Sequence, residues 1–171
     1  MDERIKKMAT LQMESKHAVP ELMLSQTRVI RAPRERVYEA WTNPEIMMKW
    51  MGPSTMRCPK VSLDVRVGGA YRIAFESNDA PARAEGESCD TGASAAVGHY
   101  TRIVPNELLQ FTWASNWQPG EETVVTVMLK DVPGGTELTL VHENFLTETS
   151  RDGHNTGWAG SFEKLAALLE A

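Results

Sequence analysis

The feature that most limits the possible folds is a long series of short segments in which apolar and polar residues alternate. Tyr71, Ile73 and Phe75, for example, alternate with polar or small residues, a period of two that is typical of a half-buried strand. Comparable strand patterns cover residues 56–67, 97–104, 109–113, 123–130 and 136–143. Turn residues such as Pro133-Gly134-Gly135 separate them. The middle of the chain therefore predicts consecutive antiparallel strands.

Helical patterns stand before and after this series. A strand over residues 27–31 is followed by Pro33 and Pro44, each placed where a first helical turn accepts proline. These prolines predict two short helices, the second reaching Met51. In the last segment, apolar residues recur at spacings of four, three and four: Trp158, Phe162, Leu165 and Leu169. This spacing predicts a long amphipathic helix, and strands kept apart from helices indicate an α+β fold.

The 171 residues suit one domain with a short extension. We expect residues 1–24 to form the extension, which is helical or frayed, packs on the domain or reaches a partner subunit. Residues 25–171 would form the domain. Residues 76–96 hold polar and small side chains, and a loop of this length is usually a lid, a binding loop or disordered.

Charge and composition exclude several classes of protein. The chain has 18 basic and 23 acidic residues, a net charge of −5, so no basic field is expected to attract nucleic acid or anionic lipid. No apolar run approaches the roughly 20 residues of a membrane span, and the charged N-terminus leads into no signal-peptide core. Cys58 and Cys89 form no CxxC pair. We therefore expect a cytoplasmic protein with free thiols.

Four ordered blocks, residues 27–53, 64–72, 98–113 and 135–140, carry a family resemblance. Among their motifs are Ala32-Pro33-Arg34-Glu35-Arg36-Val37, Asp64-Val65-Arg66-Val67-Gly68-Gly69 and Val104-Pro105-Asn106-Glu107-Leu108, and Gly157-Trp158 closes the match. Together they resemble the Hsp90-ATPase-activator-homologue-like family of the START/polyketide cyclase/Bet v 1-like (SRPBCC) superfamily. The resemblance implies a helix-grip fold. In this fold a curved seven-stranded antiparallel sheet surrounds a long C-terminal helix, two short helices follow the first strand, and a cavity separates sheet and helix. Family members include small-molecule binders, polyketide cyclases and a co-chaperone domain, so no single activity is implied.

Large apolar side chains come from the elements that would surround this cavity. They are Met47, Trp50, Met56, Tyr71, Phe75, Trp113, Trp158 and Phe162. Aromatic rings supply apolar area with a polar handle, and methionine adapts to irregular space. The same residues could instead fill a solid core. As a set within this fold, they predict a pocket for a small, mostly apolar ligand.

Three histidines, His99, His142 and His154, are expected to face inward from two strands and the last helix. A neutral imidazole could orient a carbonyl group or act as a general acid or base. No zinc-binding spacing and no phosphate loop or nucleophile motif accompanies them. We therefore predict neither metal nor cofactor and assign no catalytic residue.

Gly153, Gly157 and Gly160 share one stripe of the last helix. Each costs about 0.5–1 kcal/mol against alanine, so the stripe needs a reason: a strand backbone that approaches closely, or room for a ligand. Our interpretation is that it widens the pocket entrance.

These observations favour binding of a small hydrophobic molecule in an internal cavity. If a reaction follows, cyclisation, hydration or isomerisation of a carbonyl compound would suit, with His99, His142 or Tyr71 moving a proton. The alternative is a co-chaperone-like interaction module that binds a protein through the extension or the outer sheet face. The sequence is also compatible with a homodimer.

Overall fold

The computed structural model describes residues 22–81 and 94–171. The strands are β1 (Leu24–Ile30), β2 (Met56–Leu63), β3 (Ala70–Ser77), β4 (Ser94–Val104), β5 (Leu108–Ser115), β6 (Glu122–Val132) and β7 (Gly135–Glu143). The helices are α2 (Arg34–Thr42), α3 (Pro44–Met47) and α4 (Glu148–Leu169). Nearly all of the predicted extension, most of the loop over residues 76–96 and Cys89 lie outside the described residues.

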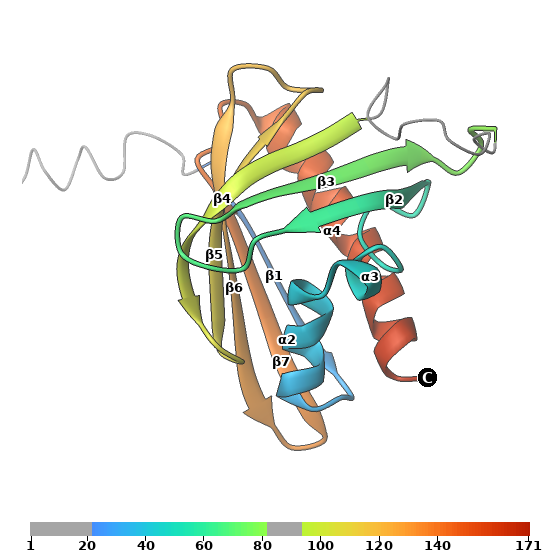
Figure 1. Cartoon of the computed structure of the whole chain (residues 1–171), viewed down its shortest axis with the longest axis vertical. Coiled ribbons are helices and arrows are strands. Elements are labelled where there is room, and N and C mark those ends of the chain that lie inside the picture. The colour runs from blue at the N-terminus through green and yellow to red at the C-terminus, as the bar shows by residue number, and fades with distance from the viewer. Residues whose placement is uncertain (1–21, 82–93) are drawn as a thin grey trace, which may run out of the picture.

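All seven strands form one antiparallel sheet in the order β1-β7-β6-β5-β4-β3-β2. The sheet curls around α4, which crosses its concave side (Figure 1). Because β1 and β2 lie at opposite edges, the chain between them must cross the sheet, and α2 and α3 make this crossing. Helix α2 packs against β6, β7 and α4. The predicted α+β helix-grip fold is confirmed.

Element ends differ from the predictions where local hydrogen bonds change type. The second helix was expected to reach Met51, but α3 ends at Met47. Beyond it, Lys49 and Trp50 donate their N–H groups three residues back, over 3.0 and 3.2 Å, which makes turns instead of an α-helix. Strand β2 ends at Leu63 because the chain then turns, and an Arg66–Asp64 ion pair of 2.8 Å spans that turn.

Strand β2 forms one edge of the sheet and is irregular. Its pairing with β3 shifts register between Arg57 and Lys60. Pro59, which has no backbone N–H to donate, lies inside this irregularity. At the opposite edge, β1 lies beside α4, where the Gln26 side chain donates to Asn155 over 2.7 and 2.8 Å. None of the helices in the described part of the chain is long and apolar enough to cross a membrane.

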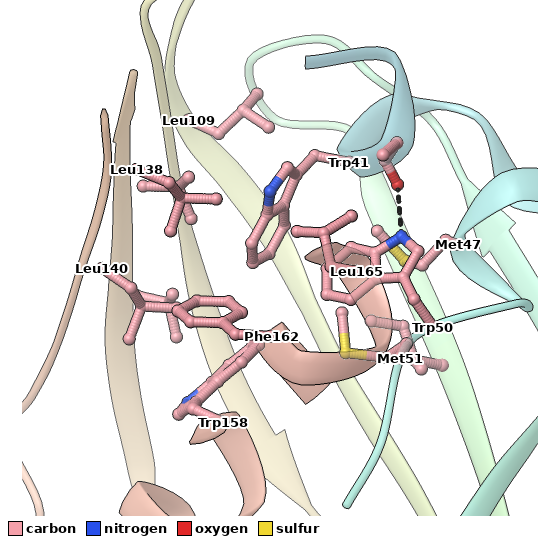
Figure 2. Packing of buried hydrophobic residues seen from close by; sticks show 14 of the residues in the cluster. Trp41, Met47, Trp50, Met51, Leu109, Leu138, Leu140, Trp158, Phe162 and Leu165 are labelled. Atoms are coloured by element: carbon pink, nitrogen blue, oxygen red, sulfur yellow. Dashed lines mark hydrogen bonds between the residues drawn. The ribbon is translucent and has the colours of Figure 1, made fainter. Parts of the chain in front are cut away.

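Trp41 of α2 lies at the centre of the core (Figure 2). Its ring centroid lies 4.8 Å from Trp50, 5.9 Å from Trp158 and 6.2 Å from Phe162. The Trp50 indole N–H donates to the Ala40 carbonyl over 3.0 Å. Aromatic rings thus fill the interior beneath α2 and α3, and any ligand space must lie elsewhere along α4.

Candidate ligand-binding site

A pocket of about 390 Å³ lies beside the N-terminal half of α4. This volume is within the range typical of small-molecule sites. Its walls come from α4 and its N-cap Thr147, from strands β2, β3, β4 and β5, and from the loops at residues 51–53 and 117–118. The described lining residues are Met51, Gly52, Pro53, Met56, Phe75, Ser94, Trp113, Trp117, Gln118, Thr147, Thr149, Ser150, Gly153, His154, Gly157, Trp158 and Ser161.

The predicted cavity residues divide into three groups. Five of them line the pocket: Met56, Phe75, Trp113, His154 and Trp158. Five others are buried without lining it: Met47, Trp50, Tyr71, His142 and Phe162. The remaining one, His99, is exposed on the outer face of the sheet.

The expectation that His99 faces inward was wrong. Its neighbour Tyr100 is buried on the concave side, and because successive strand residues point to opposite faces, His99 points outward. There its Nδ1 atom lies 3.3 Å from the Thr112 hydroxyl. His99 therefore has no part in the pocket.

His142 is fully buried behind the pocket wall. The Trp158 indole N–H can only donate, so Nδ1 of His142 accepts this bond of 3.0 Å. The Nε2 atom then carries the proton and donates to the Thr123 hydroxyl over 2.7 Å, and that hydroxyl donates to the Trp113 carbonyl over 3.1 Å. Burial, followed by repulsion from His154, lowers the pKa of His142 to about 2. His142 is therefore a neutral part of the core.

His154 lines the pocket, and hydrogen bonds also engage both of its ring nitrogens. Its Nδ1 donates to the Ser150 carbonyl over 2.8 Å, and its Nε2 accepts from the Trp113 indole N–H at 3.3 Å. Burial lowers the pKa of His154, although the Ser150 hydrogen bond and the Glu121 charge oppose this. Both histidines are thus neutral at pH 7, and each ring nitrogen already has a protein partner.

The glycine stripe of α4 has two roles. A Cβ atom at Gly153 would meet no other atom within 4 Å, and one at Gly157 would lie 3.4 Å from the Pro53 ring. At Gly160 it would lie only 2.8 Å from the Ser54 backbone nitrogen. The first two glycines therefore border pocket space, whereas the third allows a close backbone approach.

The loop that carries Gly52 and Pro53 is tied to α4. The Gly52 N–H donates to the Ser161 hydroxyl over 3.0 Å. Lys164 donates to the carbonyls of Pro53 and Met56 over 3.2 and 3.1 Å, and burial lowers its pKa. Gly52 has a φ of +111°, a conformation that favours glycine. These bonds fix one wall of the pocket.

Trp117 at the pocket mouth is a residue that sequence reasoning missed. It is 42% exposed, and its ring centroid lies 5.7 Å from Phe75 and 6.0 Å from His154. Trp117 follows the end of β5, so no strand periodicity marked it. The available signal was a tryptophan isolated in the polar sequence Asn116-Trp117-Gln118-Pro119-Gly120.

Glu121 was missed as well. It is only 5% exposed, directly before β6. One carboxylate oxygen accepts from the Leu146 N–H over 2.8 Å, and the other accepts from the Ser150 hydroxyl over 2.6 Å. Ser150 lines the pocket, so its hydroxyl connects the pocket wall to the buried Glu121 carboxylate behind it.

Comparisons with known proteins agree with this architecture. The family model described as Activator of Hsp90 ATPase homolog 1-like protein matches residues 31–170. A crystal structure from Chromobacterium violaceum is similar with 30% identity and a TM-score of 0.73, over 87% of this chain and 97% of that one. An AHSA1 protein from Silicibacter pomeroyi has 22% identity and a TM-score of 0.71, over 86% and 97%.

A protein of the dynemicin biosynthetic locus shares the fold, with 20% identity and a TM-score of 0.67. The similarity covers 89% of this chain and 48% of that protein. The comparison with curated proteins finds no match.

Proposed function

This chain belongs to the Activator of Hsp90 ATPase homolog 1-like family, and from that membership and its pocket we propose that it binds a small, mostly apolar molecule beside α4. The observation that carries the proposal is the pocket of about 390 Å³ between rings of Phe75, Trp113 and Trp158. Such a site buries most of a small ligand among apolar groups and orients it with a few polar ones.

The glycines of α4 support the same proposal. Gly153 destabilises the helix relative to alanine, yet nothing in the described structure lies where its Cβ would be. No packing contact with the described residues therefore explains this glycine. Room for a ligand against the helix backbone would explain it.

Proton transfer by the expected residues finds less support than binding. The ring nitrogens of His142 and His154 have protein partners. The Tyr71 hydroxyl donates to the Thr112 carbonyl, and burial raises its pKa well above the ordinary value. Any cyclisation, hydration or isomerisation would therefore depend on the pocket holding its ligand in a reactive shape.

The alternative, a protein-interaction module, would be favoured by a contiguous apolar patch on the outer sheet face. Val97 of β4 and Met128 of β6 are exposed there, but their strands are separated by β5. Single exposed apolar residues are ordinary on protein surfaces. The pocket is therefore the more informative feature.

The direct test uses N-phenyl-1-naphthylamine, an uncharged aromatic dye that fluoresces in apolar surroundings. We expect saturable binding to one site, with quenching of tryptophan fluorescence because three tryptophans line the pocket. Native mass spectrometry of protein purified from its own host should also reveal a co-purified small molecule. Absence of both saturable dye binding and a co-purified molecule would refute the proposal.

A further inference from the structure

We infer that the pocket selects uncharged ligands and that Glu121 determines this selectivity by keeping anions out. The inference rests on the proposed function, because it specifies the class of molecule that the same pocket takes. It separates uncharged apolar molecules from apolar anions such as carboxylates and sulfonates.

The argument starts from the first turn of α4. Thr147, Thr149 and Ser150 of this turn line the pocket mouth. The N-terminus of a helix carries partial positive charge and ordinarily attracts anions. The Thr147 hydroxyl caps this end by accepting the Ser150 N–H over 3.1 Å, but it brings no negative charge. Left without a counter-charge, this mouth would favour a ligand with a negative head group.

Glu121 already supplies that negative charge. Its carboxylate accepts the Leu146 N–H just before α4 and the Ser150 hydroxyl within the first turn. Both donors are neutral, so the bonds leave the carboxylate with its charge. The charge also reaches the pocket wall, since it opposes the burial-driven fall in the pKa of His154. An incoming anion would therefore meet a like charge at the end of α4.

The described lining residues offer an anion no opposite charge. Among the described lining residues there is no lysine or arginine, and His154 is neutral at pH 7. An anion would lose its hydration without gaining an opposite charge, which is costly in a largely apolar site. An uncharged ligand loses far less.

A matched pair of dyes tests the inference. N-phenyl-1-naphthylamine is uncharged, and 8-anilinonaphthalene-1-sulfonate is the same ring system with one sulfonate. Titration of the neutral dye gives its affinity, and the sulfonated dye is measured by how well it displaces the neutral one. We expect the neutral dye to bind at least about tenfold more tightly, which corresponds to 1.4 kcal/mol. Equal affinities would overturn the inference and leave the proposed function intact. Failure of both dyes to bind would overturn the inference, and it would overturn the proposed function as well if no small molecule co-purifies with the protein.

Glu121→Gln separates charge from the bulk of the sulfonate. Glutamine can still accept from Leu146, and the Ser150 hydroxyl can turn to accept from its amide. We expect this variant to bind the sulfonated dye about tenfold more tightly than the wild type and the neutral dye within about twofold.

Glu122→Gln is the control, because Glu122 is the next residue and is exposed. It removes the same charge and should change neither affinity. Equal gains for the two variants would show a general charge effect and overturn the role of Glu121. An unchanged affinity of Glu121→Gln for the sulfonated dye would also overturn the role of Glu121. Should Glu121→Gln fail to fold, as judged by thermal melting, the wild-type dye ratio still decides whether anions are excluded.

Discussion

Trp158 and His142 are joined by a hydrogen bond of 3.0 Å from the indole N–H to Nδ1, which fixes one neutral tautomer of the buried imidazole. On its other side, Nε2 donates to Thr123 over 2.7 Å. A second proton on the ring would place an N–H group against the indole N–H. Burial, the larger cause, already lowers the pKa of His142 to about 2.

This bond predicts that stability falls in mild acid. A histidine of the unfolded chain has a pKa of about 6.5, so below that pH the unfolded state binds a proton that the folded state does not. Stability is therefore complete above about pH 7 and declines as the pH falls. From His142 alone we expect the free energy of unfolding to be about 2 kcal/mol lower at pH 5 than at pH 7.5. The lowered pKa of His154 acts in the same direction.

Urea denaturation at the two pH values measures this decline. His142→Gln is the matched variant, because glutamine can accept from Trp158 and donate to Thr123 without titrating. It should lose most of the pH dependence between 7.5 and 5. A variant with the wild-type pH dependence would show that His142 is not the titrating group.

Thr123→Val should destabilise the protein by about 1–3 kcal/mol, since it leaves buried hydrogen-bonding groups without a partner. The Thr123 hydroxyl serves both His142 and the Trp113 carbonyl. Thr126→Val on the outward face of the same strand is the control. It loses one bond, accepted from Gln110 over 3.1 Å, but water can replace it at this half-buried site, so the cost should be about 0.5–1 kcal/mol at most. Thermal melting compares the two variants, and equal losses would contradict the importance of the buried network.

Alanine at two glycines of α4 should have opposite effects on stability. Gly153→Ala meets open space and should stabilise the helix by about 0.5–1 kcal/mol. Gly160→Ala would place its Cβ 2.8 Å from the Ser54 nitrogen, and overpacking of this kind costs about 1–3 kcal/mol. Denaturation curves of the two variants show whether each is more or less stable than the wild type. A change of the same sign in both would remove the distinction between them.

Gly157→Leu should weaken binding of N-phenyl-1-naphthylamine by about tenfold or more, because the side chain would enter pocket space beside Pro53. Its melting temperature should change much less than its affinity. Ala159→Leu adds a comparable side chain to α4 at an exposed position and should leave affinity unchanged. Loss of stability with intact binding would show that Gly157 serves packing instead of the ligand.

Most of the fold could be predicted from the sequence because most strands keep one apolar face and the turns use residues suited to them. The orientation of His99 could not. Near His99, β4 carries Ala95, Ala96 and Gly98. These residues are too small to give an alternation of large apolar and polar side chains. The register with β5 also shifts between Tyr100 and Arg102. The face on which His99 lies therefore depends on strand pairing, which local periodicity does not reveal.

The division between core and pocket was equally hidden from sequence. Trp50 and Trp113 were both predicted to line the cavity, yet Trp50 lies in the solid core and Trp113 lines the pocket. The difference arises because Trp41 of α2 places its ring against Trp50. That contact joins separate elements, so only the assembled structure shows which part of the concave side stays open.

The irregular pairing of β2 also has a consequence for how copies of this protein can meet. A regular outermost strand is a template on which another chain can add its own strand, a common route to aggregation. Pro59 and the register shift between Arg57 and Lys60 interrupt that template. At the other margin, β1 is flanked by α4. Continuous sheets that run from one molecule into the next through β2 are therefore disfavoured.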